Sequence, residues 1–186
     1  PPGQVGALGD DVYRSIVTLI LEADGSNETA ATESAPAAAM EDEPRGRTVR
    51  FGGREATGLT PVTDALLRNP PAGDWLTWRR TLDNHGYSPL EQITRENVGE
   101  LRLAWVLSMR NGVNQTTPVV HDGVMFLANP GNVVQAIDAA TGDPIWEYRY
   151  DVPRDALTGV GATRGLALYD DKVFLSTYDA AIVAID

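Results

Sequence analysis

The side chains that could do chemistry are few in this sequence, and they lie far apart along it. Cysteine is absent, which excludes a disulfide scaffold, a thiolate zinc site, an iron–sulfur cluster and a haem c attachment site within these 186 residues. The two histidines, His85 and His121, are too few and too distant in sequence to suggest a metal cluster. Arg164 carries a planar guanidinium that suits a pair of carboxylate oxygens, and Gln115 carries an amide that donates and accepts hydrogen bonds. By spacing alone Arg164 is an ordinary surface arginine, and no residue is predicted to be catalytic or to bind a metal.

Composition and charge narrow the class of protein. The 15 basic and 26 acidic residues give a net charge of −11, which argues against a nucleic-acid partner because phosphate contacts need a basic face. Hydrophobic residues make up 42% of the chain, enough for a packed core. The longest apolar stretch, Ile16 to Leu21, is far shorter than the ~20 residues of a membrane span. We therefore expect a folded protein without a membrane span.

Three regions must position these side chains. Residues 1–25 show apolar side chains at helical spacing behind an acidic start, which predicts one amphipathic helix. Residues 26–69 form an acidic stretch rich in Ala, Pro and Ser without a sustained period, which predicts a disordered linker. Residues 70–186 are predicted to be mainly β. A lone helix with no partner, and an end inside a strand-to-turn segment, favour a piece of a longer protein.

The third region contains short strand-like runs with Gly, Asn and Asp between them. A hairpin loop is predicted at Pro130-Gly131-Asn132. The runs are 103–107, 118–120, 124–128, 133–137, 172–176 and 181–185.

An internal repeat underlies this pattern. The segment Asp122–Asp138 realigns without gaps on Asp170–Asp186, a shift of 48 residues. A period near 50 residues with about four strands per unit is typical of a β-propeller blade. A two-layer sandwich is the alternative, less favoured because sandwiches seldom repeat in register. The chain would then hold about two blades, preceded by one helix and a linker.

A turn motif follows the first copy of the repeat. Short polar residues and a glycine suit a tight turn, and the tryptophan after them offers a large surface for packing against a neighbouring blade. The motif resembles the tryptophan-docking repeat of quinoprotein propellers, where its role is structural. Its members are Ala136, Asp138, Thr141, Gly142 and Trp146.

A longer signature carries the resemblance further. The segment from Asp74 to Trp105 is similar to the start of the propeller in alcohol dehydrogenases that depend on pyrroloquinoline quinone (PQQ), with most positions matched in order and spacing. Arg79 stands where the family usually has Gly, and Thr94 where it usually has Asn; these departures put a local turn in doubt. The resemblance implies a partial eight-bladed propeller.

The resemblance also implies two cofactor-binding residues. Gln115 stands where the family usually has an acid that contacts the quinone, and Arg164 matches the arginine that binds PQQ. Two adjacent cysteines of many relatives are replaced by Thr158 and Gly159. The family's calcium ligands, catalytic aspartate and stacking tryptophan would lie beyond this chain.

The N-terminal region has its own resemblance. Pro1-Pro2-Gly3 and the helix after it resemble the end of a small cytochrome c, whose haem c attachment site would lie upstream. A cytochrome tail, an acidic linker and a PQQ propeller, in this order, match the layout of a fused quinohaemoprotein.

These features predict a periplasmic PQQ-dependent dehydrogenase that oxidises a primary alcohol or a related hydroxyl substrate and passes electrons to a haem c cytochrome. The fragment alone is expected to be inactive. A non-catalytic propeller scaffold, resembling an outer-membrane assembly lipoprotein, is the alternative, and a third reading is an interaction module that recruits partners through the acidic linker. Sequence downstream of residue 186 would decide between enzyme and scaffold.

Overall fold

The computed structural model describes residues 46–53, 55–152 and 163–186. The chain divides into two units, Pro1–Asp42 and Glu43–Asp186. The predicted helix of residues 1–25, the first part of the predicted linker, and Thr158 and Gly159 lie outside the described residues. None of the described helices is long and apolar enough to cross a membrane.

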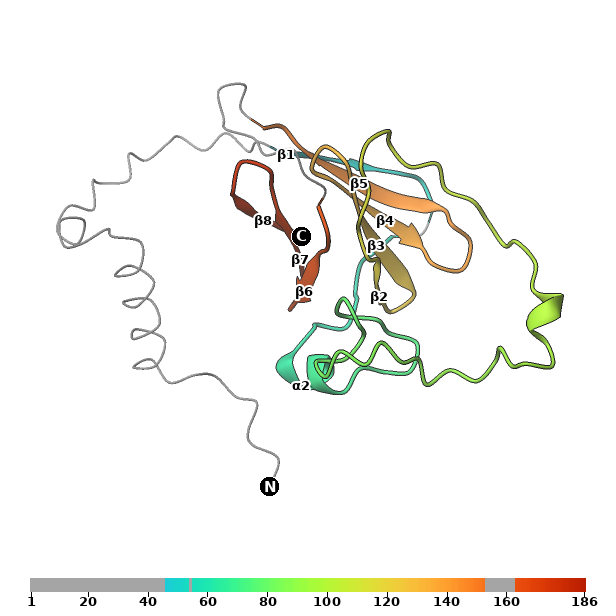
Figure 1. Ribbon diagram of the computed structural model, residues 1–186. Coiled ribbons are helices and arrows are strands. Elements are labelled where there is room, and N and C mark those ends of the chain that lie inside the picture. Colours follow the sequence, from blue (N-terminus) through green and yellow to red (C-terminus); the bar gives the residue numbers. More distant parts are fainter. Residues whose placement is uncertain (1–45, 54, 153–162) are drawn as a thin grey trace, which may run out of the picture. The chain divides into compact units, whose positions relative to one another are not determined.

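The second unit contains two antiparallel sheets (Figure 1). The first has five strands in the order β1-β5-β4-β3-β2, so β2 to β5 form a four-stranded meander, as in a propeller blade, and β1 adds a strand beside β5. The second has the order β6-β7-β8. The strands are β1 Gly46–Arg50, β2 Val119–His121, β3 Val124–Asn129, β4 Val133–Asp138, β5 Pro144–Tyr150, β6 Ala167–Tyr169, β7 Lys172–Ser176 and β8 Ile182–Ile185.

The repeat seen in the sequence is also a repeat of strand pairing. Phe126 lies opposite Ala136 in the β3–β4 hairpin, and Phe174 lies opposite Ala184 in the β7–β8 hairpin. Each pair is the other shifted by 48 residues, so the two hairpins share one register. The mainly β fold and the start of a propeller are therefore confirmed.

One hydrophobic cluster joins the two sheets. It contains buried residues of β2 to β5 together with Leu168, Val173, Leu175 and Ile185 of the second sheet. Val62 also belongs to the cluster and exchanges backbone hydrogen bonds of 2.7 and 2.8 Å with Asp170. The segment before the first blade thus helps to hold the second.

The structure differs from the sequence-based expectation within the predicted linker. Residues 46–50, inside the range 26–69, form β1 and pair with β5 along its whole length. A short helix, α2 (Asp64–Arg68), begins after Thr63, whose hydroxyl accepts a hydrogen bond from the Leu66 amide. The composition of this range predicted neither element. The reason is clear for β1, which depends on a partner strand about 100 residues away rather than on its own apolar pattern.

The predicted strand at residues 103–107 is wrong. This stretch has no regular pairing among the described residues, and Leu103 and Val106 are 80% and 76% exposed. A 3-10 turn, η1 (Val98–Glu100), precedes it. Alternating apolar residues favour a strand only where a neighbouring strand accepts the backbone hydrogen bonds, and the described chain supplies none here.

The predicted docking turn is formed as expected. The Asp138 carboxylate accepts hydrogen bonds from the amides of Ala140 and Thr141 at 2.9 and 3.1 Å. Gly142 has a φ of 78°, and a Cβ there would lie 2.6 Å from the Trp105 ring. Trp105 Nε1 also donates to the Ala139 carbonyl at 3.2 Å. Trp105, which the sequence marked only as part of the signature, is therefore the tryptophan that lies on this turn.

Trp146, the tryptophan of the motif itself, is buried in β5. It is 5% exposed, and its ring centroid lies 5.9 Å from that of Phe126. It belongs to the cluster that joins the sheets, while Ala136 beside it on β4 is fully buried. Its role as a latch between blades stays a prediction.

Candidate cofactor site

The fold brings Gln115 and Arg164 together although 49 residues separate them. The Nε of Arg164 donates to Oε1 of Gln115 at 3.3 Å, and the amide of Thr117 donates to the Arg164 carbonyl at 3.3 Å. Both side chains are exposed and line a cavity of about 510 Å³. The other lining residues are Trp78, Thr117, Val119, Gly165 and Leu166.

Equivalent strands position the two side chains. Gln115 lies just before β2, the first strand of the four-stranded meander, and Arg164 lies just before β6, the first strand of the second sheet. The Asn114 carboxamide accepts a hydrogen bond from the Thr116 amide at 3.0 Å, which fixes the backbone around Gln115. The repeat thus places both residues at the same end of neighbouring sheets.

The cavity is cationic in an acidic protein. Among the described residues, its lining contains one arginine and no carboxylate, whereas the whole chain carries a net charge of −11. Within the described parts of the chain, Arg164 makes no ion pair, and its side-chain partner is the neutral amide of Gln115. An anionic ligand would therefore find an uncompensated guanidinium here.

The cavity also has unused hydrogen-bonding capacity nearby. The hydroxyls of Thr116 and Thr163 are buried and have no hydrogen-bond partner among the described residues. These threonines adjoin Gln115 and Arg164 in sequence. The lining itself offers a guanidinium, an amide and apolar walls, which suit a planar molecule that carries several carboxylates, so the residues present fit PQQ.

A second polar cluster escaped the sequence analysis. His121 on β2 is 3% exposed, and Asp74 and Asp122 approach it so that one ligand atom from each lies within 4.8 Å of the others. Nδ1 of His121 lies 2.7 Å from the Asp74 carboxylate and Nε2 lies 2.6 Å from the Thr60 carbonyl. The sequence did not predict this cluster because Asp74 lies 47 residues before His121.

The hydrogen bonds of His121 define its chemistry. Since a carbonyl oxygen only accepts, Nε2 donates to Thr60, and Nδ1 shares a hydrogen bond with the carboxyl group of Asp74. Burial alone would lower the pKa of His121, but the hydrogen bonds to Thr60 and Asp74 and the charges of Asp122 and Asp74 together raise it above its ordinary value. Protein groups therefore occupy both ring nitrogens, and we call the cluster of His121, Asp74, Thr60 and Asp122 the His121 bridge.

Comparison with known proteins places the chain in a family. Residues 75–186 match the family described as the β-propeller domain of glucose, ethanol and alcohol dehydrogenases, named after PQQ. The chain is 42% identical over 118 residues to the dehydrogenase subunit of the quinone alcohol dehydrogenase of Gluconacetobacter polyoxogenes, covering 61% of this chain and 16% of that protein. It is 40% identical over 140 residues to 1-butanol dehydrogenase (cytochrome c) of Thauera butanivorans, covering 72% and 20%.

A solved structure supports the same family assignment. A quinohemoprotein alcohol dehydrogenase of Pseudomonas putida superposes with a TM-score of 0.58 at 38% identity, over 69% of this chain and 20% of that one. The chain spans about a fifth of the length of these relatives. The match begins at Trp75 and includes strands β2 to β8, the docking turn and the cavity that holds Gln115 and Arg164. The chain belongs to the PQQ β-propeller family of alcohol dehydrogenases.

Proposed function

We propose that the protein to which these blades belong oxidises a primary alcohol or a related hydroxyl substrate with PQQ, and that Gln115 and Arg164 bind the cofactor. The observation that carries the proposal is the cavity in which two residues 49 positions apart meet, with an arginine as the one charged side chain among its described lining residues. The names of the relatives support alcohol as the substrate class.

Each residue has a distinct task. Arg164 offers a planar, permanently charged group to a carboxylate of the ligand. Gln115 lies within hydrogen-bond reach of Arg164 and orients its guanidinium, and its own amide N–H group can donate to a quinone oxygen where an acid could not. When bound, PQQ supplies the electrophilic quinone that accepts hydride from the alcohol carbon. No described residue is assigned as the general base.

The remaining partners are proposals of the same kind. A calcium ion, held by residues outside this chain, would accompany PQQ, and the electrons would pass to a haem c in the whole protein. Relatives named as quinohemoprotein and as cytochrome c-linked dehydrogenases support the haem. A periplasmic location follows from the proposed class of enzyme.

A PQQ titration of the cofactor-free whole protein tests the assignment. Arg164→Ala removes a charge-assisted hydrogen bond worth ~1.5–3 kcal/mol, so PQQ should bind roughly 10- to 150-fold more weakly. Arg164→Lys should restore only part of the affinity because an ammonium lacks the two-pronged geometry. Arg95→Ala, at an exposed arginine that does not line the cavity, is the matched control.

Two outcomes would contradict the proposal. Unchanged affinity of Arg164→Ala would make Arg164 a surface residue without a role in binding. Failure of the unmodified protein to bind PQQ would remove the enzymatic function and favour the propeller scaffold.

A further inference from the structure

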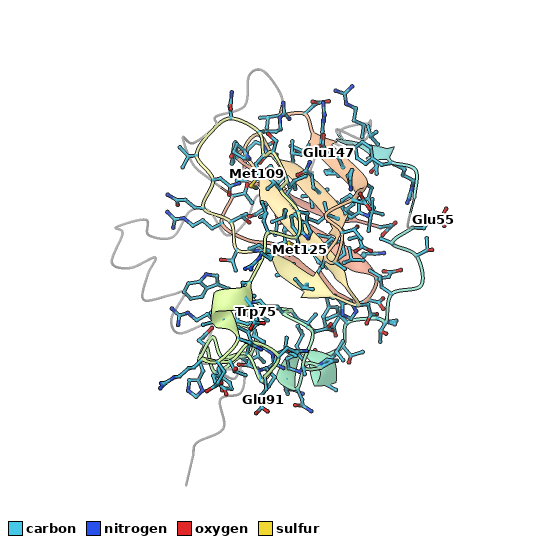
Figure 2. All side chains as sticks on the ribbon, turned by 90° about the vertical axis from the view of Figure 1, so that its right-hand side faces the viewer. Glu55, Trp75, Glu91, Met109, Met125 and Glu147 are labelled. Carbon is cyan, nitrogen blue, oxygen red and sulfur yellow. The ribbon has the colours of Figure 1, made fainter. Side chains whose placement is uncertain are left out.

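Trp78 is an exposed aromatic residue on a firmly held loop. Its side chain is 61% exposed, which is unusual for an indole. The loop is attached to the first sheet through Trp75, which exchanges two backbone hydrogen bonds of 2.8 and 2.9 Å with Val120 of β2. The indole N–H of Trp75 donates to the carbonyl of Trp78 at 3.4 Å. Figure 2 shows Trp75 at the junction of this loop with the sheet.

The other end of the loop is held by Arg80. Its guanidinium donates to the carbonyls of Pro70 and Pro71 at 3.0 and 3.1 Å, and the residue is only 9% exposed. Arg80 has a φ of 69°, a strained conformation for a residue with a side chain. Such strain persists only where the surroundings fix the backbone, so Trp78 is held at the surface by its neighbours on both sides.

The indole of Trp78 has a cation on one face and the cavity beside it. The guanidinium carbon of Arg79 lies 4.7 Å from the ring centroid. The same ring lines the cavity together with Gln115 and Arg164. A rigidly presented aromatic surface next to an uncompensated guanidinium is suited to a ligand that is both planar and anionic.

We propose that Trp78 is a ligand-binding residue of this cavity and that it contacts the planar ring system of the bound cofactor. Arg79, which holds the indole and adds a second positive charge near the cavity, is a positioning residue. The inference rests on the proposed function and adds an aromatic wall to the polar contacts of Gln115 and Arg164.

The test is a PQQ titration of the cofactor-free whole protein, followed by tryptophan fluorescence. An aromatic contact of ordinary strength predicts that Trp78→Ala weakens PQQ binding about 3- to 10-fold, while Trp78→Phe keeps most of the affinity. In Trp78→Phe the fluorescence quenched by PQQ should be smaller than in the unmodified protein, because one quenched indole is gone. Trp105→Phe, at an indole that lies on the docking turn and does not line the cavity, should leave the quenched amplitude unchanged.

The outcomes separate this inference from the proposed function. If Arg164→Ala weakens PQQ binding while Trp78→Ala and the quenched amplitude of Trp78→Phe match the unmodified protein, the aromatic wall is refuted and the cofactor site stands. If the unmodified protein binds no PQQ, both fail. The thermal unfolding of Trp78→Ala should match that of the unmodified protein, since the side chain is mostly exposed. If Trp78→Ala is destabilised, the quenched fluorescence of Trp78→Phe decides the test instead.

Discussion

The β3–β4 and β7–β8 hairpins have the same register and repeat the same sequence pattern, yet they differ in burial. Val134 on β4 is fully buried, whereas Ile182, its counterpart 48 residues later on β8, is 77% exposed. Ala136 and Ala184 differ in the same way. β4 lies between β3 and β5, while β8 is an edge strand among the described residues.

This difference shows that the register of a hairpin and the burial of its side chains are decided separately. Register is a local property, set by the turn and by the alternation of side chains, so two copies of one sequence pattern adopt it alike. Burial depends on which strands lie beside a hairpin, and here β5 pairs with β4, whereas β8 has no partner on its outer side among the described residues. The variants below change one side of the comparison at a time.

The largest effect is expected at Trp146, on β5, the strand that pairs with β4 of the first hairpin. Trp146→Ala empties a buried site beside Phe126 and should lower the free energy of unfolding of the whole protein by ~3–5 kcal/mol. Chemical denaturation measures the change. A loss below about 1 kcal/mol would show that the indole contributes little to the blade.

A smaller effect is expected at the docking turn. Gly142→Ala places a Cβ 2.6 Å from the Trp105 ring at a φ of 78°, so it should cost ~2–4 kcal/mol from strain and overpacking. Gly131→Ala is the matched control, because Gly131 has a φ of 85° with open space around it and should cost only ~1 kcal/mol. Equal losses in the two variants would mean that Trp105 does not rest on this turn.

The repeat pair itself gives the next comparison. Val134→Ala should destabilise the chain by ~2 kcal/mol, because it removes two buried methyl groups, while Ile182→Ala should change stability by less than ~0.5 kcal/mol. Denaturation of both variants of the 186-residue chain measures the difference. Similar losses would show that β8 is covered to the same extent as β4.

Much of the fold could be predicted because it depends on neighbours in sequence. The hairpin at Pro130-Gly131-Asn132 and the turn at Asp138–Gly142 use residues whose backbone preferences act locally. The strand β1 and the irregular stretch at 103–107 could not, since each is decided by whether a distant strand is present. The same holds for the His121 bridge, whose members come from three separate segments.

The candidate site was predicted only in part. Gln115 and Arg164 were identified by resemblance, and the fold brings them together. Trp78 was assigned to the signature but not to the cavity, because no sequence pattern reveals that Arg80 holds it at the surface. The bonding partners of a buried guanidinium, here two proline carbonyls, are visible only in three dimensions.

The last comparison is between His121 and its repeat counterpart. The position equivalent to His121 on β2 is Tyr169 on β6, which is 48% exposed. His121 instead joins Asp74, Thr60 and Asp122, whose carboxylate also accepts a hydrogen bond from the Thr60 amide at 2.7 Å. The bridge therefore fastens the segment before the first blade to β2 through a charge that depends on pH.

The pH dependence of stability should report this bridge. Burial lowers the pKa of His121, but the hydrogen bonds to Thr60 and Asp74 and the nearby charges of Asp122 and Asp74 together raise it above its ordinary 6.5. Its stabilising effect is therefore complete below pH 6.5 and is lost as the pH rises through the pKa of the folded state. Denaturation between pH 6 and 9 should show stability falling with pH, and His121→Gln should flatten this fall and cost ~1–3 kcal/mol at pH 6. His85→Gln removes an exposed imidazole and should leave the slope unchanged. Asp170, Asp171 and Lys172 line the same cavity as His121 and stay unchanged in His121→Gln, and a slope that survives in this variant would refute a stabilising role of the His121 charge.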